Sequence, residues 1–158
     1  MRDTNYANKA ANIENSTCSF TDKEIVSGLK QKRKLGRFIN ELIFHYTKKE
    51  SQVAYIFSTD KFVLSINQAY LQHDTYTDII TFDLSDKKSS LILSDIFISI
   101  ERVKENAETF NKKYPEELLR VIIHGALHLS GYKDKSKTQK AAMRSLEDWW
   151  IEKYASYL

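Results

Sequence analysis

Apolar residues recur along this chain with two different periods, and these periods predict its helices and strands. Between about residues 30 and 48 the apolar positions return every three or four residues, as in an amphipathic helix: Leu35, Phe38, Ile39, Leu42, Ile43 and Tyr46. A second helix is expected from a cap at Thr59 or Asp60 to about Tyr70. Three more are expected near 101–111, 115–130 and 136–155, with Pro115 at the first helical position of the middle one.

Shorter runs of β-branched and aromatic residues predict the strands. STCSFTD (16–22) and QVAYIF (52–57) are two candidates, and 76–84 and 89–100 are two more, separated by a polar turn at 85–88. Residues 1–14 show no apolar periodicity and are expected to be loosely held. Since no repeat or proline-rich linker divides the chain, the sequence predicts one α+β domain over 1–158. We expect a small sheet packed with about five helices.

Composition narrows the class of protein only a little. Hydrophobic residues make up 42% of the 158, which is enough for a core, and the formal net charge of +3 is compatible with an RNA partner without requiring one. The single cysteine, Cys18, excludes a disulfide within the chain. No apolar stretch approaches the roughly 20 residues of a membrane span, and the polar N-terminus does not resemble a secretory signal. We therefore expect a cytoplasmic protein without membrane contact.

The stretch HGALHLSGYKD (124–134) carries the clearest chemistry. On a helix, His124 and His128 leave the same face, close enough for one ion to take a nitrogen from each. Gly131 follows where the apolar pattern stops, so the chain can turn back and offer Asp134 as a third ligand. The spacing predicts a metal site at the end of a central buried helix.

Two other interpretations of these histidines stay open. A pair spaced like this is often an ordinary surface or core pair, although two buried imidazoles would need polar partners. The spacing also resembles metalloproteases of the HExxHxxGxxH type, in which the glutamate is the general base. Gly125 stands at that position here, which disfavours a peptidase.

Beyond this spacing, the sequence resembles the YbeY family, bacterial metal-dependent endoribonucleases of ribosomal RNA maturation. HGALHLSGYKD is similar to the family's HGxLHLxGYDH. INQAYLQHDTYTDIITFDLS (66–85), LSDIFIS (93–99) and MRSLED (143–148) resemble further family stretches in the same order, so the likeness spans roughly residues 30–155. The resemblance implies a small mixed sheet surrounded by helices, with a zinc-type ion at the motif.

The chain departs from the family pattern at four positions. Asp134 replaces the third histidine, Lys133 the preceding aspartate, Leu71 an arginine and Tyr76 a proline. A carboxylate at Asp134 suits zinc, since sites with two histidines and one carboxylate keep an open position for water. Leu71 raises the question of whether the protein is catalytic.

Lysines beside Asp134 are candidate RNA contacts. Lys133, Lys135 and Lys137 would draw a polyanionic strand towards a metal, although a solvated loop is the alternative. The basic run 30–37 is interpreted as a solvated helix face. For four carboxylates the sequence does not decide between a role in the site and a local capping role: Asp74, Asp78, Asp95 and Glu117.

The sequence therefore predicts a single-strand-specific metal-dependent endoribonuclease of ribosomal RNA maturation and ribosome quality control. The expected cofactor is one divalent ion, Zn²⁺, held by His124, His128 and Asp134. The expected partners are ribosomal RNA and the ribosome or its proteins, with no DNA. The alternatives are a non-catalytic, metal-stabilised RNA- or ribosome-binding factor and, behind it, a metalloprotease.

Overall fold

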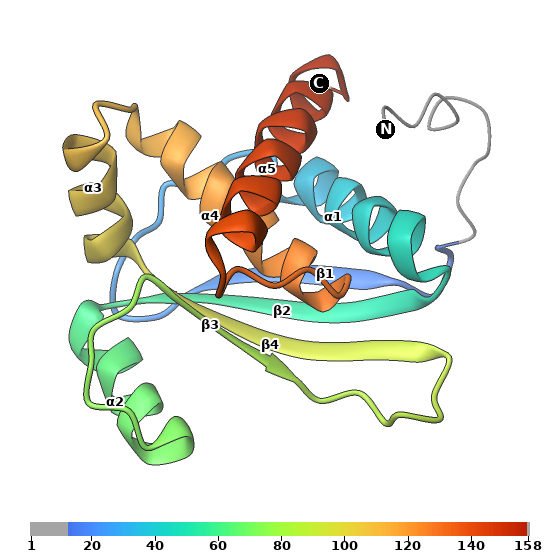
Figure 1. Ribbon diagram of the computed structural model, residues 1–158, viewed down its shortest axis with the longest axis horizontal. Helices are drawn as coiled ribbons and strands as arrows, with labels where there is room; N and C mark the ends of the chain where they lie inside the picture. The colour runs from blue at the N-terminus through green and yellow to red at the C-terminus, as the bar shows by residue number, and fades with distance from the viewer. Residues whose placement is uncertain (1–12, 158) are drawn as a thin grey trace.

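The computed structural model describes residues 13–157, as four strands in one sheet with five helices around it (Figure 1). In chain order the elements are β1 (Thr17–Asp22), α1 (Lys32–Thr47), β2 (Glu50–Ser58), α2 (Asp60–Leu71), β3 (Ile79–Asp83), β4 (Leu91–Ser99), α3 (Ile100–Thr109), α4 (Tyr114–Leu129) and α5 (Lys137–Tyr157). The α+β class and the small mixed sheet with five helices are confirmed. None of the helices described has the length and apolar run that a membrane crossing needs.

The sheet has the strand order β1-β2-β4-β3. β1, β2 and β4 run parallel, and β3 pairs antiparallel with β4 at one edge, with Ile80 opposite Phe97. Side chains alternate between the two faces of β4, and Ile92, Ile96 and Ile98 are buried on one of them. Because of this alternation, one face of the sheet contributes to the main core, and the other face is covered less extensively.

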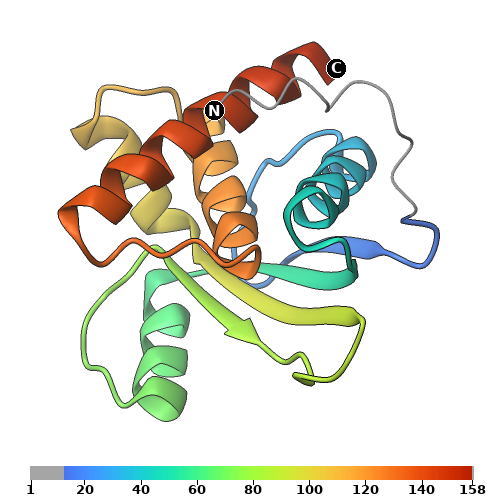
Figure 2. The same cartoon turned by 45° about the vertical axis from the view of Figure 1, so that its right-hand side comes forward.

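The helices divide unequally between the two faces. α1, α3, α4 and α5 lie on one side of the sheet, and α2 lies on the other (Figures 1 and 2). On the first side α5 packs across α4 and α1, where the fully buried Trp150 meets the ring of Phe38 at 5.6 Å between centroids. α4 therefore lies in the interior, between the sheet and α5.

Close packing of α4 against the sheet depends on Gly125. A Cβ at this position would lie 3.0 Å from Ile79 Cδ1 and 3.1 Å from Ile96 Cδ1, so the helix sits almost directly on β3 and β4. The buried Tyr55 hydroxyl of β2 donates to the Ile122 carbonyl at 2.8 Å and fixes the same helix from a second strand. These contacts set the position of every side chain on α4.

Several expected boundaries differ from the observed ones by one to three residues. β3 begins at Ile79 and not at 76, because residues 72–78 form an irregular connection after α2. α4 begins at Tyr114, so Pro115 occupies its second position, where a missing N–H is equally harmless. The predicted loose segment 1–14 lies outside the described residues except for Ile13 and Glu14. The single domain over 1–158 stays a prediction.

Candidate metal centre

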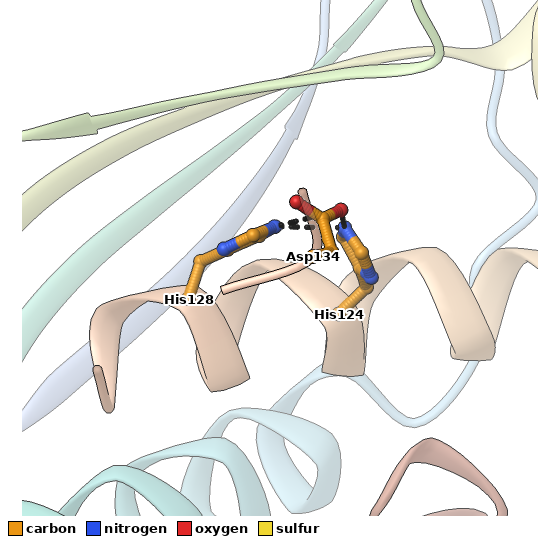
Figure 3. A group of neighbouring side chains, drawn as sticks. All are labelled: His124, His128 and Asp134. Atoms are coloured by element: carbon orange, nitrogen blue, oxygen red, sulfur yellow. Dashed lines mark hydrogen bonds and ion pairs between the residues drawn. The ribbon is translucent and has the colours of Figure 1, made fainter. Parts of the chain in front are cut away.

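Three side chains from the end of α4 and the loop after it converge on one point (Figure 3). His124 Nε2 and His128 Nε2 lie 2.9 Å apart. Asp134 Oδ2 lies 3.2 Å from the first nitrogen and 3.4 Å from the second. The structure thus brings together the three residues that the sequence nominated as metal ligands.

The local sequence explains how Asp134 returns to the helix. Gly131 has φ of +100°, a conformation that ordinary side chains resist, and it reverses the chain directly after α4. The amide of Gly131 donates to the His128 carbonyl, and the amide of Tyr132 donates to the Leu127 carbonyl, which closes the helix end. Three residues after the glycine, Asp134 faces the two imidazoles.

The second nitrogen of each imidazole has a fixed partner. His128 Nδ1 lies 2.9 Å from the Tyr132 carbonyl, which can only accept, so this nitrogen carries the proton. His124 Nδ1 lies 2.7 Å from Glu147 Oε1 and likewise donates to a carboxylate. In the neutral rings both Nε2 atoms are therefore left with lone pairs, and these point at each other and at Asp134.

Three acceptor atoms at such distances repel one another unless a cation lies between them. Zinc bonds to nitrogen and carboxylate oxygen are about 2.0–2.2 Å, so the donor atoms of a tetrahedral site lie about 3.3–3.5 Å apart. The two separations from Asp134 Oδ2 are close to this range, and the one between the nitrogens is shorter. The donor set and its spacing fit a divalent metal ion.

A proton can compete with a metal for His124. Burial lowers the pKa of this imidazole, but the hydrogen bond to Glu147 and the charges of Glu147, Asp134 and Asp78 outweigh burial and raise its pKa above the ordinary value. Metal binding at His124 should therefore release protons and weaken as the pH falls.

The cluster opens into a cleft of about 420 Å³ between α4 and the edge strand β3. The histidines are partly exposed here, their side chains 20% and 28% accessible, and not buried as the sequence had indicated. No lysine or arginine is among the described residues that line the cleft: Thr77, Asp78, Ile79, Thr81, Asp83, His124, His128, Leu129 and Asp134. A phosphate entering it meets mostly acceptors, so a cation at the three donors would be needed to attract it.

Of the three aspartates whose role the sequence left undecided, Asp78 is the one that lines the cleft. Burial raises the pKa of its carboxyl, partly offset by the charge of His124, and Asn106 Nδ2 donates to it at 3.2 Å. Asp74 is exposed and accepts from Gln68. Asp95 alternates with Ile96 on β4 and so faces away from α4.

The remaining candidates do not line the cleft. Lys133, Lys135 and Lys137 are exposed in and after the loop that carries Asp134. Leu71 ends α2 on the opposite side of the sheet, is 41% exposed and is not a cleft residue. Contact of the three lysines with RNA remains a prediction.

Sequence reasoning missed the carboxylate that contacts His124. Glu117 shares the ligand stripe of α4, but it is buried, its Oε2 has no hydrogen-bond partner among the described residues, and burial raises its pKa. The partner is Glu147 of α5, only 5% exposed. A signal was present, because Glu147 falls on the apolar stripe of α5 with Met143, Trp150 and Tyr154.

Fold and cluster together define a small α+β protein whose central helix presents two histidines, joined by a loop carboxylate, in an arrangement suited to a divalent metal. Comparison with known proteins then gives the family. The sequence model of the family described as Endoribonuclease YbeY matches residues 13–155, and the chain belongs to this YbeY family. The resemblance drawn from the motifs is confirmed.

Individual relatives agree with the family model. The chain is 50% identical to Endoribonuclease YbeY of Flavobacterium psychrophilum over 111 residues, covering 70% of this chain and 78% of that protein. It is 41% identical to that of Cytophaga hutchinsonii over 140 residues, covering 86% and 94%. A Thermotoga maritima protein solved in solution is similar in fold, with a TM-score of 0.53 and 26% identity over 87% of this chain and 92% of that one.

Proposed function

We propose that this protein is a metal-dependent endoribonuclease that cuts single-stranded RNA during ribosomal RNA maturation and ribosome quality control. The observation that carries the proposal is the convergence of three lone-pair donors, His124 Nε2, His128 Nε2 and Asp134 Oδ2, at the wall of an open cleft. The endoribonuclease names of the relatives supply the reaction class. The ion we expect is zinc, because two imidazoles and one carboxylate suit it.

Residues in and beside the cleft have different parts in this activity. His124, His128 and Asp134 hold the ion, with Glu147 and the Tyr132 carbonyl fixing the rings. When bound, a zinc-type ion supplies Lewis acidity towards a phosphoryl oxygen and lowers the pKa of a coordinated water. Thr81 and Asp83 of β3, and Thr77 just before it, offer hydrogen bonds to an RNA strand bound in the cleft.

Binding of RNA would depend on charge outside the cleft. Lys133, Lys135 and Lys137 surround the metal loop, and we propose that they contact phosphates of the incoming strand. The same chemistry would act in the cytoplasm on ribosomal RNA, next to the ribosome or its proteins. RNA, not DNA, is the substrate that the relatives' names indicate.

A second candidate is a metal-stabilised factor that binds RNA or the ribosome without cutting. Leu71 favours it, because an exposed leucine stands where the family pattern has an arginine. A metalloprotease, the third interpretation, finds less support. Gly125, in the position of the protease glutamate, faces Ile79 and Ile96 of the sheet and not the cleft.

One set of assays separates these functions. Purified protein is incubated with end-labelled single-stranded RNA, the same RNA as a duplex, and casein, each with chelator and with zinc restored. Cleavage of the single strand that chelator stops and zinc restores is the expected result. A His128→Ala preparation is the control for contaminating nucleases. Stoichiometric metal with RNA binding but no cleavage would favour the non-catalytic factor.

A further inference from the structure

Glu147 lies in surroundings that are unusual for a carboxylate. It occupies the buried side of α5, and its two oxygens have different partners on α4. Oε1 lies 2.7 Å from His124 Nδ1, and Oε2 lies 3.0 Å from Arg120 Nη1. Since a buried carboxylate is costly unless it is paired, both contacts are needed to keep Glu147 in place as an anion.

Arg120 is held as firmly as the carboxylate. It precedes His124 by one helical turn, is 8% exposed, and donates through Nη2 to Asp148 Oδ1 at 2.6 Å as well as through Nη1 to Glu147. The guanidinium therefore bridges two successive residues of α5. A planar, always charged fork suits such a bridge, whereas a lysine is a compact charge on a flexible stem and would not fix the angle between the two carboxylates.

The two histidines are consequently oriented by different means. His128 donates to the Tyr132 carbonyl, a neutral acceptor four residues away in the loop that follows α4. His124 donates to a charged acceptor 23 residues away, on a helix that Arg120 joins to α4. A carboxylate on the far nitrogen makes the near nitrogen a stronger ligand and fixes the rotation of the ring.

We propose that Arg120 and Glu147 form a positioning pair, in which Arg120 holds the Glu147 carboxylate at the angle that keeps His124 Nδ1 protonated and its Nε2 aimed at the metal. Neither residue touches the ion or the substrate, so both act through His124. The inference rests on the proposed metal centre, because His124 must be a ligand for its orientation to matter there.

Two neighbours provide matched controls. Asp148 shares Arg120 but is 60% exposed, and it makes no contact with Glu147 or His124 among the bonds of the described residues. Arg144 Nη1 forms a long ion pair with Glu147 Oε2 at 3.7 Å, without a hydrogen bond, and its side chain is 49% exposed. Asp148→Asn and Arg144→Gln change charge in the same region but leave the Arg120–Glu147–His124 bonds in place.

The test measures zinc affinity by competition with a chromophoric chelator, next to thermal unfolding of each variant. Arg120→Met and Glu147→Gln should weaken zinc binding about 10–100-fold, as loss of a partner behind a metal ligand typically does. Arg120→Lys should restore part of the loss, and both controls should stay within about twofold of wild type. Unchanged affinity in a folded Arg120→Met protein would overturn the proposal. If that variant does not fold, Arg120→Lys and Glu147→Gln decide.

A second readout needs no metal. In ¹⁵N spectra of histidine side chains at alkaline pH, wild-type His124 should carry its proton on Nδ1, as a slowly exchanging, downfield N–H. Glu147→Gln and Arg120→Met should shift His124 towards the other tautomer and leave the His128 signals unchanged. A wild-type protein that binds no zinc would sink the metal centre itself. The spectra would still show whether Arg120 and Glu147 orient the ring, and an unchanged His124 tautomer in both variants would show that they do not.

Discussion

The two walls of the cleft are held in different ways. On the α4 wall, each imidazole has its second nitrogen fixed, one by a carbonyl of the following loop and one by α5. On the β3 wall, the polar side chains have local bonds: Thr77 Oγ1 donates to the Ile79 carbonyl, and Asp83 Oδ1 accepts from the Ser85 amide. Among the strands that the structure describes, β3 is also an edge strand and pairs only with β4. The α4 wall thus presents donor atoms held in a spacing that fits a small ion, whereas Thr77 and Asp83 of the β3 wall are bonded to neighbouring residues of their own segment.

Two of the four departures from the family pattern, Lys133 and Asp134, lie in the loop after α4. The other two, Leu71 and Tyr76, lie at the end of α2 and in the connection before β3. Tyr76, in place of a proline, lies under the Arg102 guanidinium at 4.8 Å from the ring centroid, and Arg102 also pairs with Asp60 at 3.0 Å. The loop before β3 has thus gained a cation–π contact that anchors it to α3 and α2. The Tyr76 departure thus changes how the loop before β3 is held, whereas the Asp134 departure exchanges one type of candidate metal ligand for another.

The largest expected effect comes from removing an imidazole of the α4 wall. His124→Ala or His128→Ala should abolish zinc binding at stoichiometric metal, because two donors cannot hold the ion against water and buffer. RNA cleavage should disappear with it. Elemental analysis of the dialysed proteins and the RNA assay check both statements.

His73→Ala is the matched control for these two variants. This histidine is exposed in the connection between α2 and β3 and does not line the cleft. It should retain one equivalent of zinc and wild-type cleavage. A full equivalent of ion in both His124→Ala and His128→Ala would show that the metal binds elsewhere.

The next largest effect is expected at Gly125, where α4 packs against β3 and β4. Gly125→Glu would force a carboxylate between α4 and the side chains of Ile79 and Ile96, and should lower the free energy of unfolding by at least about 3 kcal/mol. Urea denaturation measures this cost. Gly125→Ala should cost less than about 1 kcal/mol, since the isoleucine methyl ends can shift and alanine favours the helix.

The same glutamate variant tests the peptidase interpretation. With position 125 facing the sheet, Gly125→Glu should gain no casein hydrolysis. A stable Gly125→Glu protein that cleaves casein would place this position in the cleft and return the metalloprotease to consideration.

The sequence was most informative where structure is local. The helix with His124 and His128, its end at Gly131 and the return of Asp134 all lie within eleven residues, so spacing alone predicts their meeting. Glu147 stood visibly on the apolar stripe of α5, but periodicity does not say which helix that stripe meets. Its contact with His124 depends on how α5 crosses α4, which is set by long-range packing.

The β3 wall was harder to predict for a related reason. Asp78 was one of several carboxylates in family-like stretches, and its place in the cleft follows from the pairing of β3 with β4 beside α4. The alternation along β4 sends Asp95 to the other face, and this too becomes clear only when the covered face is known. Faces of a sheet are assigned by the packing of helices, which the sequence pattern did not fix.

A smaller effect is expected from charge beside the cleft. Replacing Lys133, Lys135 and Lys137 by glutamine should weaken binding of unrelated single-stranded RNAs to a similar degree and reduce the slope of log affinity against log salt by about 2. Filter binding across a salt series gives the slope. A matched triple variant of exposed α1-end residues, Lys30, Arg33 and Lys34, should keep the wild-type slope. If the wild type and both triple variants gave equal slopes, the loop lysines would be solvated residues that do not contact RNA.

The smallest effect that still distinguishes the walls is a change of metal preference at Asp134. This residue supplies the only oxygen among the three donors, and its side chain is 38% exposed, which leaves room for an imidazole. Carboxylate oxygen suits Mn²⁺ better than imidazole does, whereas imidazole suits zinc. Asp134→His should therefore retain zinc and raise the ratio of zinc to manganese affinity, and Asp134→Ala should weaken both by at least about tenfold. Asp134→Asn, with the same size and no charge, separates the loss of the anion from the loss of the side chain. Chelator competition with each metal measures the ratios, and an Asp134→Ala protein that binds both ions like wild type would remove Asp134 from the ligand set and leave the α4 wall with its two histidines alone.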